Sequence, residues 1–181
     1  EGRVKYVQAG ILAAMSDNAE EVETGMAFLQ NLVRRQVEAG AHFLDLNVDE
    51  ISLRRKEQET AMRWLVPTIA GMCDTPLSVD SSCIGTIAAG LEVAGSDRPV
   101  MLNSASLERL DALDLAVQYN CHVIATAAGV SGMPQNTEER VINASQVVDA
   151  AVAKGIPLNR IYIDPLIFPI SVDAEFGIHC L

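Results

Sequence analysis

The feature that most constrains the fold is a repeat in which a short apolar run stops at a polar residue and a helical segment follows. Within residues 76–106, one apolar run ends at Asp80 and the next ends at Asn103. Runs of this kind predict buried strands. Residues 83–94 between them carry small and apolar side chains at helical spacing. The stretch therefore predicts a β-α-β unit with parallel strands, each ending at a polar residue.

The same alternation extends along the chain. Further strands are expected at 42–48, 121–128 and 161–167, with Asn47 near the end of the first and Asp164 near the end of the last. Residues 4–15 are expected to form a short helical or irregular segment. Helices are expected before and between the strands, at 20–39, 52–72, 107–119 and 137–154, and another is expected to begin at Ser171. Strands that alternate with helices favour a parallel sheet wound right-handedly.

Periodicity alone leaves two architectures open, a doubly wound open sheet and a TIM (β/α)8 barrel. Asn47, Asp80, Asn103 and Asp164 all fall at predicted C-terminal strand ends, which a closed barrel would gather around one pocket. An open sheet would spread them along a line. No Gly-x-Gly-x-x-Gly or Walker loop follows a strand. We therefore expect a barrel, formed as one domain by residues 1–181.

Composition excludes several classes of function. The chain has 181 residues, of which 49% are hydrophobic, which suits one α/β domain with an aliphatic core. Lys and Arg number 13 against 24 Asp and Glu, so the net charge of -11 disfavours nucleic acid as a partner. No apolar run reaches the roughly 18 residues that a membrane span needs. A soluble, cytoplasmic protein is expected.

Cysteine and histidine spacing predicts neither a disulfide framework nor a metal centre. The four cysteines form no Cys-x-x-Cys pair, which is typical of reduced packing residues in a cytosolic enzyme. The three histidines stand singly, without the spacing of metal ligands. We expect no bound metal. The cysteines are Cys73, Cys83, Cys121 and Cys180, and the histidines are His42, His122 and His179.

Five motifs together resemble the pterin-binding (β/α)8 methyltransferases. They are LDLNV at 44–48, SVDSS at 78–82, MLNSAS at 101–106, SGMP followed by Arg140, and YIDPLIFPISV at 162–172. Each motif alone is weak, but the five occur in the family's order with compatible spacing. The chain is most similar to methyltetrahydrofolate:corrinoid/iron–sulfur protein methyltransferases. The folate domain of cobalamin-dependent methionine synthase and dihydropteroate synthase are more distant relatives.

The resemblance implies that Asp80, Asn103 and Asp164 bind the pterin ring. A pterin presents an amino group beside a ring N–H, and one carboxylate can accept hydrogen bonds from both of these donors. An amide can pair with an edge that carries both a donor and an acceptor. The alternative is that these residues cap helix N-termini, where Asp and Asn are favoured. Neighbouring serines are better cap candidates, so we favour ligation for these three. For Asn47 the two interpretations weigh equally.

The chain departs from the family pattern at both ends. Its motifs correspond to strands two to six of the barrel, so an incomplete barrel is expected. In the methyltransferases, an Asn on the seventh strand, in a Ser-Asn-Val-Ser type motif, hydrogen-bonds the methylated folate nitrogen. No residue here matches it. The catalytic residue is therefore unassigned, and a sheet with unpaired edges predicts a homodimer or an aggregating chain rather than a stable monomer.

Three functions follow from the resemblance. The first is a methyltransferase that binds methyltetrahydrofolate and passes its N5 methyl group to the corrinoid cofactor of a partner protein. The second is a condensing enzyme of the dihydropteroate synthase type. The third is a non-catalytic pterin-binding fragment. We favour the first, since the methyltransferases are the most similar.

Overall fold

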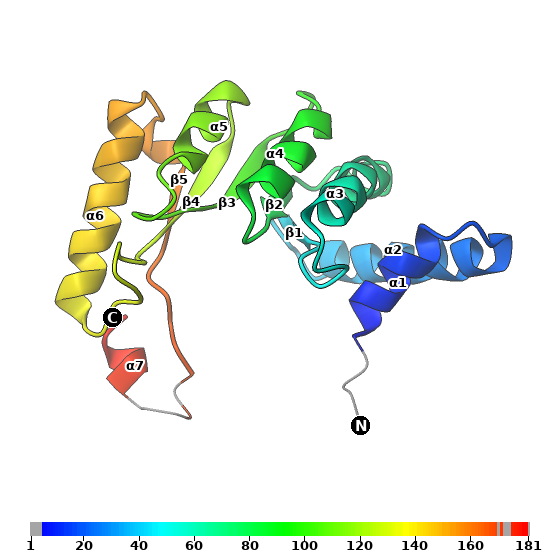
Figure 1. Cartoon of the computed structure of the whole chain (residues 1–181), viewed down its shortest axis with the longest axis horizontal. Coiled ribbons are helices and arrows are strands. Elements are labelled where there is room, and N and C mark those ends of the chain that lie inside the picture. The colour runs from blue at the N-terminus through cyan, green and yellow to red at the C-terminus, as the bar shows by residue number, and fades with distance from the viewer. Residues whose placement is uncertain (1–4, 170, 172–174, 181) are drawn as a thin grey trace. The chain divides into compact units, whose positions relative to one another are not determined.

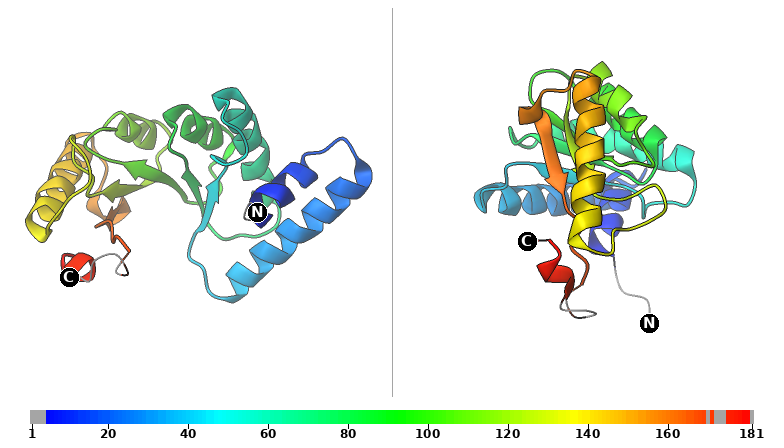
Figure 2. Two further views of the ribbon diagram at one scale, coloured as in Figure 1. Left: turned by 60° about the horizontal axis from the view of Figure 1, so that its bottom comes forward. Right: turned by 90° about the vertical axis from the view of Figure 1, so that its left-hand side faces the viewer.

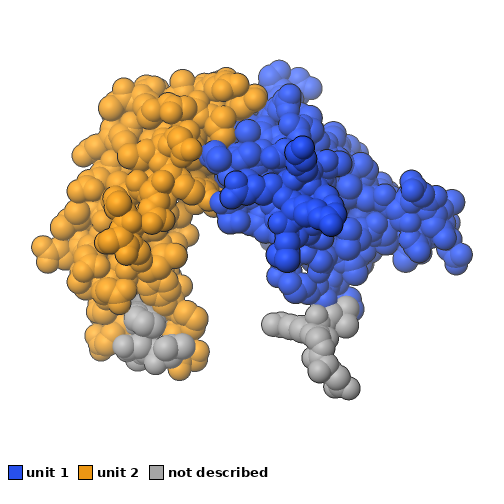
Figure 3. Space-filling model, in the orientation of Figure 1, with its two compact units in different colours: residues 1–100 blue, residues 101–181 orange. Residues whose placement is uncertain are grey.

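The chain divides into two compact units, residues 1–100 and 101–181 (Figure 3). The structure, a computed structural model, describes residues 5–169, 171 and 175–180. Each unit is built from strands that alternate with helices along the chain (Figure 1). The boundary falls between Val100 and Met101.

The first unit begins with a pair of helices and continues with a parallel strand pair. Strands β1 and β2 pair in parallel, with Leu44 opposite Leu77 and Asn47 opposite Asp80. Helices α1 and α2 pack on each other, as do α3 and α4 (Figure 2). The elements are α1 Tyr6–Ala14, α2 Ala19–Glu38, β1 Leu44–Asn47, α3 Arg55–Ala70, β2 Leu77–Asp80 and α4 Ile84–Val93.

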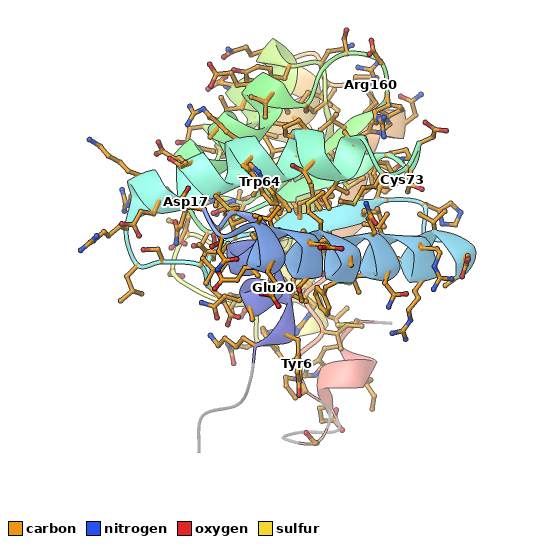
Figure 4. All side chains as sticks on the ribbon, turned by 90° about the vertical axis from the view of Figure 1, so that its right-hand side faces the viewer. Tyr6, Asp17, Glu20, Trp64, Cys73 and Arg160 are labelled. Atoms are coloured by element: carbon orange, nitrogen blue, oxygen red, sulfur yellow. The ribbon has the colours of Figure 1, made fainter. Side chains whose placement is uncertain are left out.

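Helix α2 shows why these boundaries arise. The Asn18 side chain caps it by accepting from the backbone N–H of Glu20 at 2.9 Å, and acidic residues in the first turn favour the helix dipole. Figure 4 shows Glu20 at this end of the helix and Trp64 on α3. After the C-cap Ala39, Gly40 has a φ of 85°, a conformation that glycine adopts without strain.

The second unit is a three-stranded parallel sheet in the order β3-β4-β5, with helices between the strands. Helix α6 packs on β4 and β5, and in Figure 2 it runs beside β5. The core is aliphatic, with Leu102, Leu113, Val123 and Val147 fully buried. The elements are β3 Val100–Ala105, α5 Ala112–Gln118, β4 His122–Thr126, α6 Thr137–Ala153, β5 Ile161–Asp164 and α7 Glu175–Ile178, with a short 3-10 turn at Leu158–Arg160.

The predicted α/β fold of parallel strands alternating with helices is confirmed, and it is consistent with an incomplete (β/α)8 barrel. Some predicted boundaries are wrong. Helix α5 begins at Ala112, because residues 107–111 form turns before it. Strand β5 ends at Asp164, because Pro165 has no N–H to continue the ladder. The predicted start of the last helix falls partly on residues 172–174, outside the described residues.

Candidate functional site

Asn47 and Asp80 lie side by side at the C-terminal ends of β1 and β2 in the first unit. The Asn47 Nδ2 atom donates to Asp80 Oδ2 at 2.8 Å. The Asn47 Oδ1 atom accepts from the backbone N–H of Asp49 at 2.8 Å. Both ends of the amide are therefore engaged, which fixes its orientation and directs an N–H at the Asp80 carboxylate.

A second contact orders the loop that follows Asp80. The Asp49 carboxylate accepts from the Ser81 hydroxyl at 2.5 Å and from the backbone N–H of Ser82 at 2.8 Å. Ser81 is buried, and charge-assisted hydrogen bonds of this kind are stronger than neutral ones. Asp49 therefore connects the loop after β1 to the loop after β2.

The surroundings of Asp80 favour its protonated form. Burial is the largest cause and raises the pKa of this carboxyl, while the N–H donated by Asn47 lowers it. The negative charges of Asp45 and Asp49, with a hydrogen-bonding contact to the Asp45 carboxyl, raise the pKa further. The net direction is upward, so Asp80 holds a proton at a higher pH than an ordinary aspartate does.

Asp80→Asn is expected to stabilise the fold near neutral pH. With the native pKa raised, the unfolded state loses this proton first, so stability falls as pH rises from about 4 through the native pKa. The amide carries no charge and can still accept from Asn47. The gain should stay under about 1 kcal/mol, because a half-buried charge is partly screened.

Thermal unfolding at acid and neutral pH tests this expectation. The melting temperature of Asp80→Asn should exceed that of the parent near neutral pH, and the difference should vanish near pH 4, where the carboxyl is protonated in both states. Asp149→Asn, the same change at an exposed position of α6, is the control. An equal gain at both pH values would contradict the raised pKa.

Asn103 lies in β3 of the second unit, opposite Ile124 of β4. The prediction that this strand ends at Asn103 is wrong, because β3 continues to Ala105. The pairing register shifts between Asn103 and Ala105, and such an irregularity re-aims side chains next to functional sites. The following carbonyl, that of Ser104, accepts from the Arg109 guanidinium. Asn103 therefore lies where the pairing between β3 and β4 is locally irregular, and the Arg109 guanidinium holds the backbone at the next residue.

Asp164 is the last residue of β5, which ends three residues earlier than the predicted strand 161–167. Its carbonyl oxygen accepts from the backbone N–H of Ala127 at 2.9 Å, which ties the strand end to the segment after β4. Its carboxylate Oδ1 accepts from the backbone N–H of Leu166 at 2.8 Å. One carboxylate oxygen is thus used within the loop, and the group is held in a defined orientation.

None of the four predicted site residues caps a helix. Helix α4 begins after Cys83 and α5 after Asp111, and neither cap residue makes a side-chain cap hydrogen bond. The local bonds of Asn47 and Asp164 close turns directly after their strands. The capping interpretation is therefore wrong for these residues. Each unit has its own candidate residues. Asn47 and Asp80 lie at strand ends of the first unit, and the second unit has Asn103 within β3 and Asp164 at the end of β5.

Sequence reasoning assigned no role to the residues that hold the backbone around the candidate site. Asp49 and Arg109 hold the backbone beside Asp80 and Asn103, and Arg140 contacts the loop after Asp164. The available signal was the placement of charged residues in the loops and helices that follow each strand.

Among the described side chains, no group of three His, Cys, Asp or Glu could hold a metal ion. No described helix is long and apolar enough to cross a membrane.

The chain belongs to a family of enzymes that bind pterins. The family described as pterin binding enzyme matches residues 16–179, which includes strand ends from both units. The predicted resemblance is thereby confirmed.

Three relatives show which members of the family the chain is similar to. It is 26% identical over 160 residues, 83% of the chain, to the methylcorrinoid:tetrahydrofolate methyltransferase of Eubacterium limosum. It is 26% identical to the methionine synthase of Mycobacterium leprae and 25% identical to that of Mycobacterium tuberculosis, each over 154 residues and 80% of the chain. The match spans 56% of the methyltransferase and 12% of each methionine synthase.

Proposed function

We propose that this chain binds the pterin ring of methyltetrahydrofolate through Asp80, Asn103 and Asp164, with Asn47 holding Asp80 in place. The observation that carries the proposal is that parallel strands of a pterin-binding family member end in carboxylates and an amide whose orientations are fixed. The Asn47 bond uses Oδ2 of Asp80, and the Leu166 bond uses Oδ1 of Asp164. Because a carboxylate can accept several hydrogen bonds, both groups keep acceptor capacity for a ligand.

The chemistry of the pterin fits these groups. Adjacent donors, an exocyclic amino group and a ring N–H, pair with one carboxylate, and an amide such as that of Asn103 can meet a mixed donor and acceptor edge. The half-buried positions of Asp80, Asn103 and Asp164 strengthen such bonds, since water competes less there. Their role would be to bind and orient the folate.

We further propose that the protein passes a methyl group between the folate N5 atom and the corrinoid of a partner protein. One relative is named for methyl transfer between a methylcorrinoid and tetrahydrofolate, and another is named for methionine synthesis. The name of the Eubacterium limosum enzyme gives transfer from a methylcorrinoid to tetrahydrofolate, the reverse of the predicted direction. One site serves both, because a catalyst stabilises the same transition state in either direction. The corrinoid supplies the reactive metal, and this chain supplies binding and orientation.

Methyl exchange by the full-length protein tests the proposed function. Purified protein with methyltetrahydrofolate and a reduced corrinoid protein should produce methylcorrinoid, followed by the visible absorbance of the corrinoid. The triple variant Asp80→Ala, Asn103→Ala, Asp164→Ala should lose folate binding and exchange together. Pterin binding with condensing activity and no methyl exchange would instead favour a synthase of the dihydropteroate type.

A cytoplasmic location and a homodimer remain predictions. Cell fractionation would check the first, and light scattering would check the second.

A further inference from the structure

Arg140 of α6 is a buried cation placed against the loop that follows β5. Its side chain is 3% exposed. Its Nε atom donates to the carbonyl of Pro165 at 3.0 Å, and its Nη2 atom donates to the carbonyl of Leu166 at 3.3 Å. The Nη1 atom donates to the carbonyl of Asn136, just before α6, at 3.0 Å. In the described part of the chain, its hydrogen-bond acceptors are these three backbone oxygens.

An aromatic ring covers the same guanidinium. The Arg140 Cζ atom lies 5.5 Å from the centroid of the Phe168 ring, within the range of a cation–π interaction. Arg140 thus contacts three residues of the segment 165–168. Burying a cation costs free energy unless its donors are satisfied. The Arg140 donors are satisfied by backbone carbonyls and not by a carboxylate. The side chain therefore holds the loop backbone in place.

The loop that Arg140 holds also orients Asp164. Leu166 has a φ of 60°, a left-handed conformation that costs a residue with a side chain roughly 1 kcal/mol or more. The backbone N–H of Leu166 bonds the Asp164 carboxylate, while its carbonyl accepts from Arg140. One strained residue therefore connects the buried cation to the candidate pterin ligand, and the contacts of Arg140 offset the strain.

We propose that Arg140 is a positioning residue for pterin binding, which holds Pro165 and Leu166 so that the Asp164 carboxylate faces the pterin. The inference rests on the proposed function, because it assigns Asp164 to the ligand. Arg140 itself is too buried to touch a pterin. Lysine cannot replace it, since its ammonium lacks the planar fork of donors that reaches two successive carbonyls.

Affinity for methyltetrahydrofolate, measured by calorimetry on the full-length protein, tests the role. Arg140→Lys should weaken binding by about tenfold, as loss of a group that orients a ligand does. Phe168→Leu removes only the ring and buries no new charge, so it should fold and weaken binding by a smaller factor. Arg35→Lys, the same change on the exposed part of α2, should leave the affinity unchanged.

The decisive readout is the coupling to Asp164. In an Asp164→Ala background, Arg140→Lys and Phe168→Leu should each change affinity by less than about twofold, because the group they position is gone. A merely structural role predicts the same loss in both backgrounds, and that result overturns the inference alone. If Arg140→Lys does not fold, the Phe168→Leu cycle decides by itself. If Asp164→Ala binds folate as the parent does, the proposed ligand assignment fails, and the inference fails with it.

Discussion

Asp164→Asn should weaken methyltetrahydrofolate binding by roughly 30-fold to several-hundred-fold, on the order of 2 to 4 kcal/mol. If the Asp164 carboxylate accepts two adjacent pterin donors, an amide turns an N–H toward one of them and replaces an attraction with a clash of donors. Asp80→Ser mainly deletes a contact, so its loss should be smaller. Calorimetric titration of both variants in the full-length protein would measure the difference.

The geometry around Asp164 makes this substitution informative. Its Oδ1 atom accepts from the N–H of Leu166, and the amide oxygen of an asparagine can accept the same bond. The loop should therefore keep its conformation, and the loss should be confined to the ligand. Asp149→Asn on the exposed face of α6 controls for the change of charge. If Asp164→Asn is folded and binds as tightly as the parent, Asp164 does not bind the pterin.

Local patterns were sufficient to locate the strands. The apolar runs before Asp80 and Asp164 are strands β2 and β5, and each polar residue is the last of its strand. Pattern failed at β3, where pairing with β4 carries the backbone past Asn103 to Ala105. Strand length is set by the neighbouring strand as well as by side-chain polarity, and a single sequence does not show the neighbour.

The hydrogen bonds and charges around the candidate site residues were not predictable from the sequence. Asn47 and Asp80 are 33 positions apart, and their hydrogen bond follows from the β1–β2 register. The raised pKa of Asp80 arises first from burial and also from Asp45 and Asp49, which only the folded chain brings together. Arg140 similarly reaches a loop 25 positions away. Such long-range contacts determine how the candidate residues are oriented, and residue spacing does not encode them.

Gly25→Ala should destabilise the protein by about 1–3 kcal/mol or more, because α1 crosses α2 at this residue. A Cβ atom at Gly25 would lie 2.3 Å from the backbone nitrogen of Ala14 and 2.7 Å from the carbonyl oxygen of Gly10. These are backbone atoms, so relief requires α1 to move away from α2. Alanine has the higher helix propensity, by about 1 kcal/mol, so a loss of stability must come from the helix contact. Urea unfolding of the full-length protein would measure it.

Gly71→Ala is the matched control in the same unit. Gly71 ends α3 with a φ of -75°, which any residue adopts, and an added Cβ would lie 3.5 Å from its nearest neighbours. This variant should be neutral or gain up to about 1 kcal/mol, because alanine reduces the freedom of the unfolded chain. A Gly25→Ala protein as stable as the Gly71→Ala protein would show that α1 does not pack this closely on α2. A loss only in Gly25→Ala would place the effect in the α1–α2 contact.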